Sequence, residues 1–145
     1  MNYTPVLAGA GRPAAVGALL LRLSLGTMWI AHAMLKLLTF TLPGTARFFE
    51  SVGLPGVLAY PVFAAELIGG VLILLGWHGR SASTLLLPIL LGAGAVHLPN
   101  GWVFTNAGGG WEYPAFLFAA SLAHVLIGDG IWAWRPKASR HPVAA

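Results

Sequence analysis

The sequence predicts an all-α integral membrane protein, a four-helix bundle with a short interfacial helix in its first outer loop. Hydrophobic residues make up 57% of the 145 residues and charged residues only 8%, with a mean hydropathy of +0.78. A soluble domain usually carries about a quarter charged residues. Four apolar segments approach the ~20 residues that cross a bilayer core. Because open sheet edges cannot satisfy their backbone groups in lipid, these segments are predicted as helices.

In chain order, we expect a tail at 1–13, a four-span domain at 14–134 and a basic tail at 135–145. The spans are placed at about 14–38, 57–75, 81–98 and 113–134. The N-terminus lacks the basic region and long apolar stretch of a secretory signal. In the first loop, "GTARFFESVGLPG" alternates apolar and polar residues as a helix in the headgroup layer does. Alternatively, its two Phe residues cover the mouth of a pocket.

The basic residues predict the orientation. One side of the bilayer receives most of them, namely Arg12, Arg80, Arg135, Lys137 and Arg140, whereas the other receives Arg47 and Lys36. The positive-inside rule therefore places both termini in the cytoplasm and the loops at 39–56 and 99–112 outside. The net charge is +4, but its cations are scattered singly around apolar runs. This pattern favours membrane orientation over nucleic-acid binding.

Ionisable residues inside spans are costly, so each one needs a reason. One face of the first span carries, within an arc of about 80°, Arg22, Trp29, His32 and Lys36. Glu66 and His124 lie at similar depths in the second and fourth spans. We expect a buried cluster of Arg22, Glu66 and His124. Two readings stay open: the cluster fixes helix order, or His32, Glu66 and His124 form a catalytic proton relay tuned by Arg22.

A second polar and aromatic group gathers near the outer surface, around the run "VHLPNGWVFTNAGGGWEYP" at 96–114. Its candidate ligand-binding residues are His97, Asn100, Trp102, Trp111, Glu112, Tyr113 and Phe116, together with Arg22, Trp29 and Lys36 of the first span. Such residues could hold a ring with carbonyl or hydroxyl groups. We interpret the loop as a lid over an outward-facing pocket. Interfacial enrichment of Trp and Tyr is the alternative explanation.

The amino-acid composition permits few classes of cofactor. The chain has no Cys, which excludes iron–sulfur ligation, thiolate chemistry and covalent c-type haem. His32, His97 and His124 lie on different spans without an i,i+4 pair, so we predict no metal site. A redox role would therefore need a bound organic cofactor, for which a quinone is the candidate, and a redox partner protein.

The chain resembles the DoxX family of small four-helix bacterial membrane proteins. The stretches that carry the resemblance are "LLLRLSLGTMWIAHAMLKL", "GTARFFESVGLP", "AAELIGGVLILLG" and the loop at 96–114, within residues 16 to 134. The resemblance implies a bundle in the bacterial inner membrane. The family takes its name from a subunit of a thiosulfate:quinone oxidoreductase, and some relatives are linked to membrane oxidoreductase complexes or oxidative-stress systems. It supplies no set of catalytic residues.

Three functions follow as hypotheses. The first is a quinone-linked oxidoreductase component that binds an apolar ring in the outward-facing pocket. The second is a non-enzymatic anchor or assembly module for a partner protein, and the third is a small-solute transporter. Whether the protein is an enzyme stays open. Ala65, Gly69 and Gly70 permit close helix contact within or between chains, so a homo-oligomer is also possible.

Overall fold

The computed structural model describes residues 11–134, and the regular elements of that part are all helical. The five α-helices are α1 (Arg12–Met34), α2 (Leu42–Ser51), α3 (Ala59–Leu75), α4 (Gly79–His97) and α5 (Glu112–Ile127). A π-helical turn at Leu35–Thr39 continues α1, and short 3₁₀ turns at Gly56–Leu58 and Leu98–Asn100 precede α3 and follow α4. The predicted C-terminal tail, with the basic residues Arg135, Lys137 and Arg140 that support the predicted orientation, lies outside the described residues.

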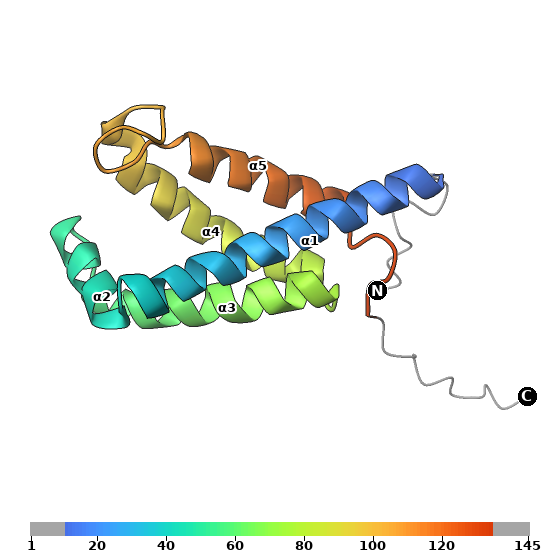
Figure 1. The fold of residues 1–145 in the computed structure, drawn as a ribbon, viewed down its shortest axis with the longest axis horizontal. Helices are drawn as coiled ribbons and strands as arrows, with labels where there is room; N and C mark the ends of the chain where they lie inside the picture. The colour runs from blue at the N-terminus through green and yellow to red at the C-terminus, as the bar shows by residue number, and fades with distance from the viewer. Residues whose placement is uncertain (1–10, 135–145) are drawn as a thin grey trace, which may run out of the picture.

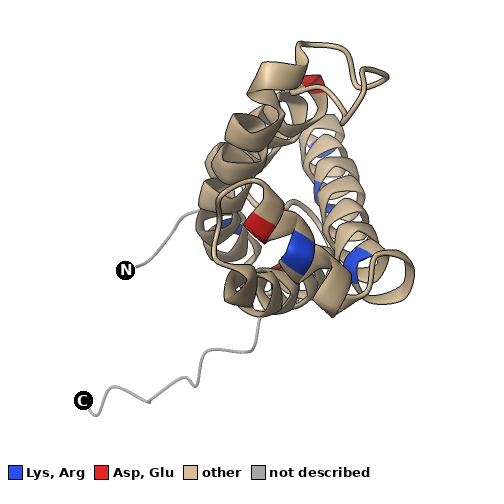
Figure 2. Cartoon of the chain, turned by 90° about the vertical axis from the view of Figure 1, so that its left-hand side faces the viewer, with Lys and Arg blue, Asp and Glu red and all other residues tan. Residues whose placement is uncertain are grey.

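Three helical stretches are long and apolar enough to cross a membrane: Arg12–Thr39, Gly56–Leu75 and Gly79–Asn100. They agree with the first three predicted spans, and the chain is a multi-pass membrane protein. Figure 2 shows how few charged positions interrupt the ribbon. Because an unpaired backbone N–H or C=O group is costly in lipid, these apolar runs form continuous helices.

The fourth predicted span, at 113–134, is wrong at its C-terminal boundary. Helix α5 is apolar but has 16 residues and ends at Ile127. Gly128 follows with a φ of 93°, a left-handed conformation that glycine adopts readily and that cannot continue a right-handed helix. The backbone at 128–134 then turns back toward α1 and α3, where Trp134 N donates to Leu75 O at 3.0 Å.

The long helices pack as two pairs, α1 along α3 and α4 along α5, and further contacts join α3 to α4 and α1 to α5 (Figure 1). Glycine allows the close approach of α1 and α3, because a Cβ on Gly26 would lie 2.8 Å from the backbone nitrogen of Leu74. A Cβ on Gly70 would lie 2.9 Å from Trp29 Cβ, and one on Gly69 would lie 2.7 Å from the Leu86 side chain of α4. The small residues of α3 therefore serve contacts within this chain.

Different structural elements lie at the two ends of the molecule (Figure 1). Helix α2 and the loop at 101–111 lie at one end, which we call the loop end, whereas the start of α1, the α3–α4 turn and the end of α5 lie at the other, the termini end. A helix in the first loop was predicted and is present as α2. Its first turn is capped by the Thr41 hydroxyl, which accepts from Gly44 N at 3.2 Å.

Candidate functional site

An ion pair joins the first and third helices in the loop-end half of the molecule. Lys36 Nζ lies 3.0 and 2.8 Å from the two carboxylate oxygens of Glu66. Glu66 is only 3% exposed, and Lys36 is half-buried. Lys36 belongs to the π-helical turn, in which Phe40 N donates to Leu35 O at 2.9 Å. A π-turn shifts the helical register of the following side chains and is frequent at functional sites.

Arg22 does not join this pair. Its Nη1 donates to the carbonyl of Asp129 at 3.0 Å and its Nη2 to the carbonyl of Trp132 at 3.4 Å. The guanidinium also lies directly against Gly76, where a side chain would collide with it. Arg22 therefore holds the segment after α5 against the ends of α1 and α3. Arg22 is 3% exposed, and backbone carbonyls are suitable partners for a buried guanidinium.

His124 forms a separate cluster at the termini end. It is fully buried, its Nδ1 lies 2.8 Å from the Ser83 hydroxyl, and its Nε2 lies 3.2 Å from Asp129 Oδ1. Sequence reasoning missed Ser83 and Asp129. The signal for Asp129 was present, because a carboxylate within the predicted fourth span is as costly as the other charges that were considered. Ser83 gives no such signal, since serine is common in membrane helices.

The expected cluster of Arg22, Glu66 and His124 is therefore wrong. Arg22 and Lys36 are fourteen positions apart on α1, so their layers are separated by about 21 Å at 1.5 Å per residue. Between them lies a buried apolar layer that contains Leu25, Leu86 and Leu117. Because α5 ends at Ile127, His124 lies near the termini end and not at the depth of Glu66, and the long side chain of Lys36 reaches Glu66 instead.

His32 connects α1 to α5 at the loop end. Its ring stacks on Tyr113, with centroids 5.5 Å apart and ring planes inclined by 20°. His32 Nδ1 lies 2.8 Å from the Met28 carbonyl. A carbonyl can only accept, so Nδ1 carries the proton and Nε2 of the neutral ring is an acceptor.

Two buried donors in the same region lack a protein partner. Neither the Trp29 Nε1–H nor the Tyr113 hydroxyl has a hydrogen bond among the described residues. Trp29 is 4% exposed and precedes His32 by one helical turn on the same face. A buried polar group without a partner is uncommon and indicates a water, an ion or a ligand.

The polar residues of the 101–111 loop bind the loop's own backbone. His97 Nδ1 and Asn100 Nδ2 both donate to the Gly108 carbonyl, at 3.0 and 3.1 Å. Asn106 Nδ2 donates to Asn100 O at 2.7 Å. These contacts explain the polar residues of this loop without a ligand, because the backbone groups of a compact loop must find hydrogen-bond partners.

The start of α5 is tied to the same loop. Phe104 N donates to Glu112 Oε1 at 2.7 Å, and the rings of Trp102 and Trp111 meet edge to face with centroids 4.4 Å apart. This second pair of contacts fixes the loop over the first turn of α5.

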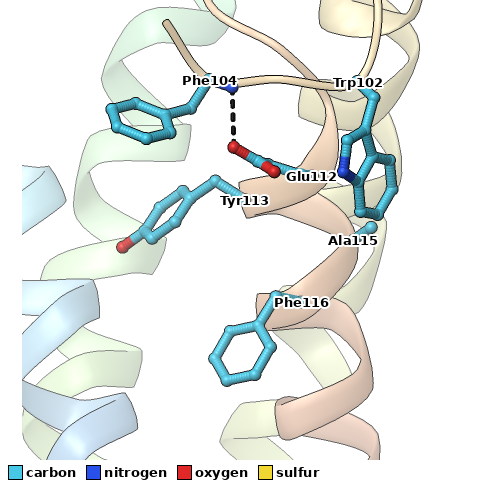
Figure 3. Close-up of a pocket in the computed structure, with 6 residues that line it drawn as sticks. All are labelled: Trp102, Phe104, Glu112, Tyr113, Ala115 and Phe116. Carbon is cyan, nitrogen blue, oxygen red and sulfur yellow. Dashed lines mark hydrogen bonds between the residues drawn. The ribbon is translucent and has the colours of Figure 1, made fainter.

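An open pocket of about 520 Å³ lies between this loop and α5 (Figure 3). Its lining residues are Trp102, Phe104, Glu112, Tyr113, Ala115 and Phe116. Residues of the loop do form one edge, as the lid interpretation expected, but no described residue of α1 or α3 lines the pocket. Tyr113 links the two regions: it lines the pocket, and in Figure 3 its hydroxyl points toward the neighbouring helices rather than toward Glu112.

The candidate residues thus fall into four groups. Trp29, His32, Lys36, Glu66 and Tyr113 form what we call the loop-end site. The pocket holds Trp102, Glu112 and Phe116 beside Tyr113, whereas His97, Asn100 and Trp111 brace the loop. Arg22 and His124 belong to the termini end.

Comparison with known proteins adds a family and one relative. The sequence model of the DoxX family matches residues 17–98, more than half of the chain. A protein of Bacillus subtilis (strain 168) named "Putative oxidoreductase CatD" is 41% identical over 78 residues, which are 54% of this chain and 57% of that protein. The chain therefore spans little more than half the length of this relative. No solved structure matches the chain.

Proposed function

Because the chain belongs to the DoxX family, we propose that it is an inner-membrane, quinone-binding component of a bacterial oxidoreductase. We further propose that it forms a four-helix membrane bundle with both termini in the cytoplasm and α2 in the interface. Helix α5 serves as the fourth span: its 16 residues cover about 24 Å, a mismatch that bilayer thinning accommodates. The oxidoreductase name of CatD supports the reaction class.

The observation that carries the proposal is the pair of unpartnered donors, Trp29 Nε1–H and Tyr113 O–H. The carbonyl oxygens of a quinone are acceptors, and its ring is flat and apolar. The stacked His32–Tyr113 pair offers flat aromatic surfaces beside the Tyr113 hydroxyl. A quinone entering from lipid would satisfy both donors without bringing a charge into the bundle.

The charged residues of the loop-end site suit the proton part of the reaction. Reduction of a quinone to a quinol takes up two electrons and two protons. Within the loop-end site, His32 and Glu66 are the groups that we assign to proton transfer, and Lys36 balances the charge of Glu66. The proton relay considered for His32, Glu66 and His124 is thereby narrowed to His32 and Glu66. The electrons come from a partner protein.

The test is titration of the purified, lipid-depleted protein with a short-chain quinone, followed by Trp fluorescence quenching. Tyr113→Phe keeps the ring and removes the hydroxyl, so we expect the affinity to fall about threefold to tenfold, as for one hydrogen bond. Tyr60→Phe is the matched control, since Tyr60 is exposed on α3 and is not one of the residues of the loop-end site. If the wild type binds no quinone, the proposal fails, and partner capture would then favour the anchor function.

A further inference from the structure

A second pocket lies at the termini end, far from the loop-end site. It has a volume of about 490 Å³ and is lined by Arg12, Gly130, Ile131, Trp132 and Ala133. It therefore forms between the start of α1 and the segment that turns back after α5. Neither the ion pair nor the proposed quinone site uses any of these residues.

The residues that line this pocket include several donors. Arg12 is exposed and supplies a guanidinium, which matches the geometry of phosphate oxygens. Among residues 11–134, no hydrogen-bond partner is recorded for the backbone N–H of Gly130, Trp132 or Ala133. Gly130 and Trp132 have φ values of 70° and 55°. Left-handed residues between right-handed ones turn successive N–H groups to one side and make anion-binding concavities.

Arg22 fixes the direction of these N–H groups. It binds the carbonyls of Asp129 and Trp132 from within the bundle. The peptide bonds are trans, and in a trans peptide the N–H points opposite to the C=O. The N–H groups of Gly130 and Ala133 therefore point away from Arg22, which does not line the pocket. The buried arginine orients the donors of a turn whose outer side is open.

An apolar surface continues from the pocket along α1. Arg12, Val16 and Leu20 follow one another at intervals of four and so share one helical face. Val16 is 36% and Leu20 60% exposed. On the other side of the pocket, Trp132 is 82% exposed, as expected of an aromatic residue at a membrane interface. Donors beside an exposed apolar track fit a headgroup with attached acyl chains better than a free ion.

We propose that this pocket binds the phosphate of an anionic phospholipid headgroup, with the acyl chains along the Val16–Leu20 face of α1. Basic pockets on the cytoplasmic side of membrane helices commonly hold anionic lipids, and the predicted orientation places this end there. The assignment is independent of the quinone site.

The experiment is native mass spectrometry of the full chain with phosphatidylglycerol, phosphatidylcholine or inorganic phosphate as probes. We expect bound phosphatidylglycerol to exceed phosphatidylcholine, and Arg12→Gln to lower the phosphatidylglycerol affinity about fivefold. Arg47→Gln is the matched control, because Arg47 is an exposed arginine on α2 at the loop end. It should leave the affinity unchanged.

Three results would overturn the proposal. Equal retention of the two lipids would remove the preference for an anionic headgroup. Equal losses in Arg12→Gln and Arg47→Gln would indicate general charge attraction rather than a site. Inorganic phosphate that displaces the lipid at equal concentration would assign the pocket to a free anion. Trp fluorescence of each variant establishes that the chain is folded before the comparison.

Discussion

The buried Lys36–Glu66 pair provides a quantitative test of whether Glu66 pairs with Lys36 and lies in a different layer from Arg22. Substituting Lys36→Met leaves the Glu66 carboxylate, 3% exposed, without its partner. Loss of one member of a buried pair is strongly destabilising, and we expect about 3 kcal/mol here. Glu66→Met should cost less, about 2 kcal/mol, because the Lys36 side chain is 17% exposed and its amine can reach toward water.

The double variant Lys36→Met/Glu66→Met distinguishes pairing from independent effects. Replacing both charges by apolar side chains is often neutral, so the expected loss is only about 1 kcal/mol. Because the single losses add to about 5 kcal/mol, the coupling free energy is about 4 kcal/mol. A matched cycle with Arg22→Met and Glu66→Met should be additive within about 0.5 kcal/mol, because the two residues lie in different layers.

The assay is reversible unfolding in mixed micelles by titration with a denaturing detergent, followed by Trp fluorescence. The free energy of unfolding of each variant is compared with that of the wild type. Additive losses for Lys36 and Glu66 would show that the carboxylate is not paired with this lysine. Coupling between Arg22 and Glu66 would instead restore the single central cluster that the sequence suggested.

Four further substitutions test other parts of the structure. Gly26→Ala places a methyl group against the α3 backbone and should cost about 2 kcal/mol of unfolding free energy, whereas Gly17→Ala on the same helix meets no atom within 4 Å and should be neutral or slightly stabilising. Glu112→Ala removes the acceptor of a loop amide, so hydrogen exchange at 102–104 should accelerate severalfold while exchange in α4 stays unchanged; equal exchange would refute the bracing role. Ser83→Ala leaves a ring nitrogen of fully buried His124 without its partner and should lower the free energy of unfolding by about 1–3 kcal/mol. An unfolding curve equal to that of the wild type would contradict this expectation.

The loop at 96–114 shows that residue type does not by itself decide which group each side chain binds. The distribution of basic residues predicted that it faces outward, and its His, Asn, Trp and Tyr residues were interpreted as a lid over a pocket. Its own backbone, however, accounts for His97 and Asn100. A sequence lists the donors and acceptors of a loop, but their partners depend on how the chain closes on itself, and a ligand competes with the loop backbone for the same groups.

By itself, the sequence determined the helical membrane fold, the first three spans, the helix in the first loop and the family. These follow from local quantities, because hydropathy over some twenty residues decides whether a segment enters lipid as a helix. The end of α5 is also determined locally, because Gly128 adopts the left-handed conformation that ends the helix. The longer apolar run nevertheless led to a predicted span that continues past this residue.

Only the tertiary structure decided which buried charges meet. Glu66 pairs with Lys36 and His124 with Asp129, although depth along each helix suggested other partners. An error of one residue rotates a helical side chain by about 100°, and the π-helical turn at Lys36 introduces such a change of register. Side-chain pairing across helices therefore depends on rotation and packing, which hydropathy does not encode.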